Sequence, residues 1–143
     1  MASKRKVYFF FDEVSVSLRN RAELKRIIEL IFKREKRSLY CLKYIFCSDK
    51  KLLEVNRHYL RHDYYTDVIT FDLSDKGQGI RGEIYISTER VKENALNLKE
   101  TFISELHRVI FHGALHLCGY GDKGRVEQEK MRRAEDFYLA QLN

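Results

Sequence analysis

The segment from His112 to Asp122 carries the residue types that bind a metal ion. His112 and His116 are four residues apart, and side chains at that spacing lie on one side of an α-helix, about 6 Å apart along its axis. Two imidazole nitrogens placed in this way can share one ion. Glycines follow closely, and they predict a chain reversal that returns Asp122 toward the histidines as a third ligand.

The helical pattern around the histidines predicts how they are held. With Gly113 as the reference direction, a stripe of apolar residues falls within about 60° on either side and must face the core, namely Phe102, Leu106, Val109, Ile110 and Leu117. His116 and His112 lie at the edge of this stripe, where a core meets a cleft. Glu105 projects between them but two turns earlier, where it either orients an imidazole or pairs with a neighbouring basic residue.

The spacing of His112 and His116 does not by itself identify a metal site or a protease. His58 and His62 have the same spacing but stand among charged residues, so we interpret them as polar contacts to phosphate in a nucleic-acid-binding protein rather than as a metal site. Gly113 stands directly after the first histidine, where zinc proteases of the H-E-x-x-H type carry their general base. A protease of that type is therefore excluded.

Length and composition favour one globular domain over residues 1–143. A chain of 143 residues with 44% hydrophobic residues can bury one core without disulfides. It has no apolar run of membrane-spanning length and no signal-peptide pattern, so a cytoplasmic location without membrane contact is expected. The three cysteines form no C-x-x-C pair and are expected to be reduced.

The charge is unevenly distributed. Residues 1–61 hold 16 Lys or Arg against 7 Asp or Glu, a net charge of +9, whereas residues 62–143 hold 11 against 14, a net charge of −3. The first part is thus predicted to meet a polyanion such as RNA. Candidate contacts there are Lys25, Arg26, Arg57 and Arg61. The alternative is a solvated face of a basic protein.

Apolar periodicity predicts an α+β fold in which about four strands form a mixed sheet packed with about five helices, with the histidine helix central. The expected strands are 7–11, buried on both faces, 39–47, and a hairpin of 67–73 with 82–87. The expected helices are 21–37 after Asn20, a short one capped by Asp49, 88–98, 102–118 and 125–142.

Four motif blocks occur in order along nearly the whole chain. His112–Tyr120 fits H-G-x-L-H-L-x-G-Y, and the upstream blocks are Asn56 with Tyr59, Asp63 with Thr66–Phe71, and Gly82–Ser87. Together they resemble the YbeY family of bacterial metal-dependent endoribonucleases. That resemblance implies an endoribonuclease that cleaves single-stranded RNA, including ribosomal RNA precursors, and that acts in ribosome assembly with the small subunit and its assembly factors, without DNA.

The resemblance also implies one Zn²⁺ and identifies two departures. The family's third ligand is a histidine, which is replaced here by Asp122, so His112, His116 and Asp122 are the predicted ligands. A carboxylate is also a known zinc ligand, although it makes the ion a weaker Lewis acid. The family's basic residue after the block tyrosine is replaced by Leu60. Arg61 follows and becomes the candidate that neutralises phosphate charge, with Glu105 as the second catalytic candidate.

The expected chemistry follows from the open fourth position of such an ion. A bound water with a pKa near neutrality either attacks the phosphorus or deprotonates the ribose 2′-hydroxyl. Two alternatives remain at this point: a zinc hydrolase with another class of substrate, and a ribosome-associated binding protein whose metal is structural.

Overall fold

Four strands form one mixed sheet in the computed structural model, which describes residues 5–142. Strands β1 (Val7–Phe11), β2 (Leu39–Cys47) and β4 (Ile80–Ser87) are parallel, and β3 (Val68–Asp72) pairs antiparallel with β4 as the predicted hairpin. The strand order is β1-β2-β4-β3. Strands β1 and β3 therefore form opposite edges of the sheet, and this separation decides which residues can reach the metal site.

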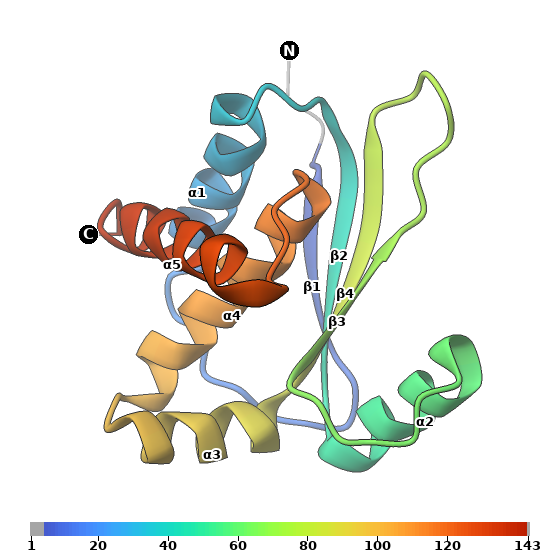
Figure 1. Cartoon of the computed structure of the whole chain (residues 1–143), viewed down its shortest axis with the longest axis vertical. Coiled ribbons are helices and arrows are strands. Elements are labelled where there is room, and N and C mark those ends of the chain that lie inside the picture. The colour runs from blue at the N-terminus through green and yellow to red at the C-terminus, as the bar shows by residue number, and fades with distance from the viewer. Residues whose placement is uncertain (1–4, 143) are drawn as a thin grey trace.

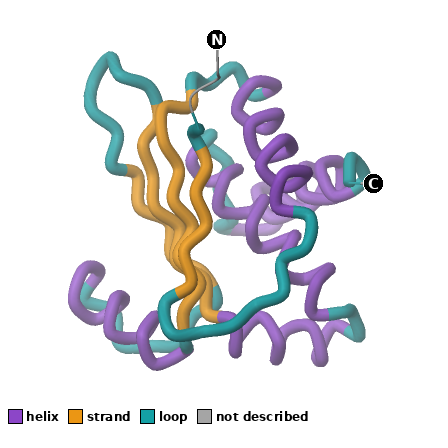
Figure 2. Tube along the Cα trace, turned by 180° about the vertical axis from the view of Figure 1, so that it is seen from behind, coloured by secondary structure: helices purple, strands orange, loops and turns teal. Residues whose placement is uncertain are grey.

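The helices lie on the sheet unequally. They are α1 (Arg21–Arg34), α2 (Asp49–Leu60), α3 (Thr88–Leu98), α4 (Phe102–Leu117) and α5 (Gly124–Leu139). Figures 1 and 2 show α1, α3, α4 and α5 on one side of the sheet and α2 on the other, near one end. The larger core lies on the four-helix side, and a smaller one lies under α2. This arrangement confirms the predicted α+β class with a four-stranded mixed sheet and five helices.

Helix α4 is the central element. Ten of its 16 residues are buried, and it contacts α1, α3, α5, β3 and β4. The buried Tyr44 hydroxyl on β2 donates a hydrogen bond of 2.7 Å to the Ile110 carbonyl. At Gly113 the helix approaches β4 so closely that an added Cβ would lie 2.8 Å from Cδ1 of Ile84. These contacts with the sheet therefore fix the distance of the histidine helix from the sheet and its rotation about its own axis.

Three local expectations were wrong. Ser48, rather than Asp49, caps α2, by accepting a hydrogen bond from the Lys51 amide, and Asn20 makes no side-chain cap for α1. Helix α1 ends at Arg34 instead of residue 37, because Lys36 adopts a left-handed conformation with φ 58°. These differences move helix ends without changing which faces are buried.

Strand β1 is an edge strand and is not buried on both faces as predicted. Its Phe9 and Phe11 pack on the core of the four-helix side. Phe10, on the other face, is 47% exposed and stacks with Tyr8. The continuous run of apolar residues is tolerated here because each ring of the open face covers its neighbour.

Two further sequence expectations concern thiols and membranes. Cys41, Cys47 and Cys118 are free thiols, the first half-buried and the others buried. No helix among residues 5–142 is long and apolar enough to cross a lipid bilayer.

We expect Gly113→Ala to lower the free energy of unfolding by about 1 kcal/mol. Overpacking against Ile84 costs about 1–3 kcal/mol, and the gain in helix propensity of about 1 kcal/mol offsets part of it. Urea unfolding measures the effect. Ile84→Val removes the Cδ1 atom that the new methyl meets, so the double variant should be less destabilised than the sum of the single variants. Additive losses would contradict the close approach.

Candidate metal centre

A tight turn ends α4 and brings the third ligand back. Gly119 has φ 97°, its amide donates to the His116 carbonyl at 3.0 Å, and the Tyr120 amide donates to the Leu115 carbonyl at 3.1 Å. This pair of hydrogen bonds is a Schellman motif, which needs glycine at the left-handed position. The predicted chain reversal is therefore present. Gly121 does not need a left-handed conformation, but a Cβ there would collide with the Glu127 carboxylate.

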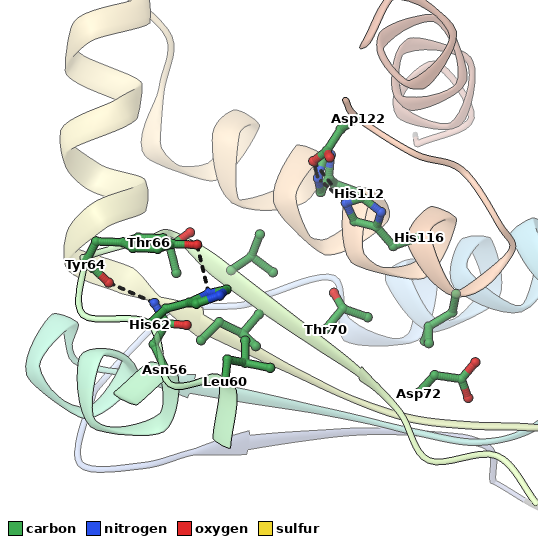
Figure 3. A pocket seen from close by; sticks show the side chains of 13 residues that line it. Asn56, Leu60, His62, Tyr64, Thr66, Thr70, Asp72, His112, His116 and Asp122 are labelled. Carbon is green, nitrogen blue, oxygen red and sulfur yellow. Dashed lines mark hydrogen bonds and ion pairs between the residues drawn. The ribbon is translucent and has the colours of Figure 1, made fainter. Parts of the chain in front are cut away.

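The reversal brings together the three predicted metal ligands. The His112 and His116 Nε2 atoms are 2.9 Å apart. Asp122 Oδ2 lies 3.2 Å from the His116 Nε2 and 3.5 Å from the His112 Nε2. Figure 3 shows the carboxylate and both rings turned toward one another at the side of a pocket. Within residues 5–142 this group has the ligand spacing of a metal site.

Hydrogen bonds at the Nδ1 atoms indicate which nitrogen of each neutral imidazole carries the proton. His116 Nδ1 lies 2.9 Å from the Tyr120 carbonyl oxygen, and His112 Nδ1 lies 2.6 Å from Oε2 of Glu135. Both oxygens only accept, so each neutral ring has its proton on Nδ1 and a lone pair on Nε2. Two lone pairs and a carboxylate oxygen then face one point. They repel one another unless a metal ion or a shared proton lies between them, so this donor set fits a metal ion.

Glu135 was not predicted from the sequence. The residue is 5% exposed, and its carboxylate accepts a hydrogen bond of 2.9 Å from Arg108 while it orients His112. Its signal in the sequence is a charged residue inside the buried stripe of α5, between Met131 and Tyr138. A carboxylate at a core position needs a partner, and here it has two.

Opposing effects set the pKa of His112. Burial lowers it, but the hydrogen bond and negative charge of Glu135, with a smaller contribution from Asp122, raise it above the ordinary histidine value. Without an ion, His112 therefore keeps a proton to higher pH than a free histidine. A metal ion must displace that proton, so binding weakens as the pH falls below this raised pKa.

The three ligands lie in the wall of a cleft of about 430 Å³ between α4, β3 and the segment that joins α2 to β3. Its other lining residues are Asn56, Leu60, His62, Tyr64, Thr66, Val68, Ile69, Thr70, Asp72 and Leu117. Within the described residues, the buried Thr70 hydroxyl in this wall has no hydrogen-bond partner. A cleft of this volume holds a small ligand or one unit of a polymer.

The other predicted catalytic residues lie outside the immediate ligand group. Glu105 is buried, burial raises its pKa, and its carboxylate makes no hydrogen bond or ion pair within the described residues. The carboxylate on His112 comes from Glu135 instead. Arg61 is the exposed C-cap of α2, with φ 55°. It stands between two residues that line the cleft, Leu60 and His62.

The predicted RNA contacts divide between the two edges of the sheet. Arg57 and Arg61 belong to the end of α2 that adjoins the cleft, and Arg57 pairs with Asp63. Lys25 and Arg26 are on α1, which packs against β1 and β2, whereas the cleft lies at β3. The structure therefore places only the first pair next to residues that line the cleft.

We expect Glu135→Gln to weaken metal binding about 10- to 100-fold at pH 8, the usual effect of losing a partner of a ligating histidine. The same change removes the charge that raises the His112 pKa, so proton competition should move to lower pH. Zinc affinity measured by chelator competition between pH 5.5 and 8.5 checks both effects. The control is Glu129→Gln, an exposed position on the same helix. Equal affinities would show that Glu135 does not hold His112.

Comparisons with known proteins identify the family of this chain. A family model described as endoribonuclease YbeY matches residues 10–143. The endoribonuclease YbeY of Cytophaga hutchinsonii is 50% identical over 94% of each chain, and that of Bacteroides fragilis is 56% identical over 68% of this chain and 69% of its own. A Thermotoga maritima solution structure has a TM-score of 0.61 at 28% identity, covering 94% of this chain and 87% of that one. The chain belongs to the YbeY family of endoribonucleases, enzymes that cleave RNA.

Proposed function

We propose that residues 1–143 form one zinc-dependent, single-strand-specific endoribonuclease unit with His112, His116 and Asp122 as ligands of one Zn²⁺. The observation that carries this proposal is the convergence of two imidazole Nε2 atoms and a carboxylate oxygen, all within 4.8 Å of one another, in the wall of a cleft. Three protein ligands and an accessible side are the pattern of catalytic rather than structural zinc.

Each residue of the site has a separate role in the proposed reaction. An ion bound there supplies Lewis acidity and an activated water. Glu135 holds the His112 ring, and the Tyr120 carbonyl holds the His116 ring. Arg61 is proposed to neutralise charge that develops on the phosphate, because it is exposed and its two sequence neighbours line the cleft. We keep Glu105 as a proposed member of the site, since its charge interacts with that of Glu135.

The substrate is proposed from the family and the charge distribution. Relatives are named endoribonucleases, and the chain has a net charge of +6, which attracts phosphate. We propose ribosomal RNA precursors as substrates, the small ribosomal subunit and its assembly factors as partners, and the cytoplasm as the location. Arg57 and Arg61 are the proposed contacts nearest the cleft, and Lys25 and Arg26 would bind RNA that continues across the molecule.

Metal removal tests the proposed function directly. We expect the zinc-loaded protein to cleave a single-stranded RNA, to cleave the matching duplex much less, and to lose cleavage with a chelator while its circular dichroism spectrum is kept. Added zinc should restore the activity. Unfolding upon chelation would indicate a structural ion instead. Absence of chelator-sensitive cleavage in the zinc-loaded protein would refute the proposal.

We expect Asp122→Ala to weaken zinc binding and to reduce RNA cleavage, because the site loses one of three donors. The loss should be at least as large as the roughly 10- to 100-fold typical of an outer partner. Asp122→His offers an imidazole instead and should retain the metal. Asp75→Ala, in the exposed β3–β4 loop, is the matched control. Full zinc content in Asp122→Ala would remove this residue from the ligand set.

A further inference from the structure

Exposed aromatic rings gather at the end of α2 and in the short segment between α2 and β3. Tyr59, Tyr64 and Tyr65 are 65%, 56% and 55% exposed, within seven residues of sequence. Burying apolar area is favourable by roughly 25 cal/mol per Å², and exposed rings do not gain this free energy. Such a concentration therefore indicates a surface that becomes covered by a ligand.

Tyr64 is the ring whose orientation is fixed toward the cleft. It stacks on His62 with ring centroids 5.2 Å apart and an interplanar angle of 20°, and its hydroxyl lies 3.0 Å from the His62 Nδ1. Both residues line the cleft. One face of the tyrosine ring is thus supported by the imidazole, and the exposed remainder is available to a flat partner.

The backbone around this ring pair is held in place. Asn56 is 1% exposed, and its side-chain amide donates a hydrogen bond of 2.9 Å to the Tyr64 carbonyl. Its own carbonyl accepts from the His62 amide at 3.1 Å. A segment tied at both residues loses little conformational freedom when it binds a ligand, so more of the contact energy appears as affinity.

The ring pair and the metal ligands share one cleft. Figure 3 shows Tyr64 and His62 on one side of it, with His112, His116 and Asp122 on the other. A phosphodiester held at the metal ligands would extend its neighbouring nucleoside across the cleft. Arg61 lies between Leu60 and His62 in the same wall segment, so positive charge accompanies the aromatic surface. This combination fits nucleic acid better than an uncharged aromatic ligand.

We propose that Tyr64, supported by His62, forms a stacking subsite for one unpaired nucleobase beside the phosphodiester that is cleaved. This inference rests on the proposed function and gives it a physical origin for strand selectivity. A base inside a duplex is already paired and stacked on both faces, and it cannot lie on the tyrosine unless the duplex opens. The subsite therefore selects single strands by the availability of a base face, with no need for sequence readout.

The test uses zinc-loaded protein and a single-stranded RNA analogue that resists cleavage through 2′-O-methyl and phosphorothioate groups. One position carries 2-aminopurine, whose fluorescence is quenched on stacking. We expect Tyr64→Ala to lose the quenching at saturation and to bind about 5- to 150-fold more weakly, the range for one stacked base. Tyr64→Phe keeps a ring and should restore both. Tyr40→Ala, an exposed tyrosine outside the cleft, should behave as wild type.

The outcomes separate the subsite from the proposed function. Equal quenching and affinity in Tyr64→Ala and wild type overturn the subsite, and chelator-sensitive RNA cleavage by the wild type would then still support the function. Loss of zinc content in Tyr64→Ala would also overturn it, because the ring would then act through the metal ligands. Absence of chelator-sensitive cleavage in the wild type removes the function and the subsite together.

Discussion

The central constraint of this structure is that two imidazole lone pairs and a carboxylate face one another at close range. The Nε2 atoms are 2.9 Å apart, and neither carries a proton when both rings are neutral and their Nδ1 atoms donate to acceptors. Such an arrangement is unfavourable by itself and becomes favourable around a cation. Other features of the site follow from this need, since Glu135 and the Tyr120 carbonyl bind the Nδ1 atoms and leave both Nε2 atoms directed toward Asp122.

The fold meets the constraint by drawing on three separate elements. Helix α4 supplies the rings, the turn after it supplies the Tyr120 carbonyl and Asp122, and α5 supplies Glu135. The sheet holds α4 through the Tyr44 hydroxyl and the close approach at Gly113. Arg108 neutralises Glu135 and also binds Asp136, so α4 and α5 are joined by charge at the level of the metal ligands.

Local spacing was enough to predict that the three candidate ligands converge, whereas the residues that support them were not visible in it. His112, His116 and Asp122 lie within 11 residues of sequence, so helix geometry and a glycine turn suffice to bring them together. Glu135 is 23 residues from His112, and only the packing of α5 on α4 shows that it replaces Glu105 as the partner of the imidazole. The buried position of Glu135 among apolar neighbours was the available signal.

The strand order likewise could not be predicted from apolar periodicity. The pattern of residues 7–11 identifies a strand but does not say whether it has one neighbour or two, and β1 proved to be an edge. The same missing information grouped Lys25 and Arg26 with Arg57 and Arg61, although α1 packs against β1 and β2 and the cleft lies at β3, the opposite edge. The net charge of a stretch of sequence does not show at which edge of the sheet its charged residues lie.

The turn after α4 links the local stability of the backbone to the supply of metal ions. Helix ends normally fray at low cost, yet here the residues that end the helix also hold His116 and provide Asp122. An ion that binds only the folded turn adds its binding free energy to the local stability of that turn. Opening of the last turn of α4 and release of the ion are then one equilibrium. The wall of the cleft would stiffen as the metal ion becomes available and loosen as it becomes scarce.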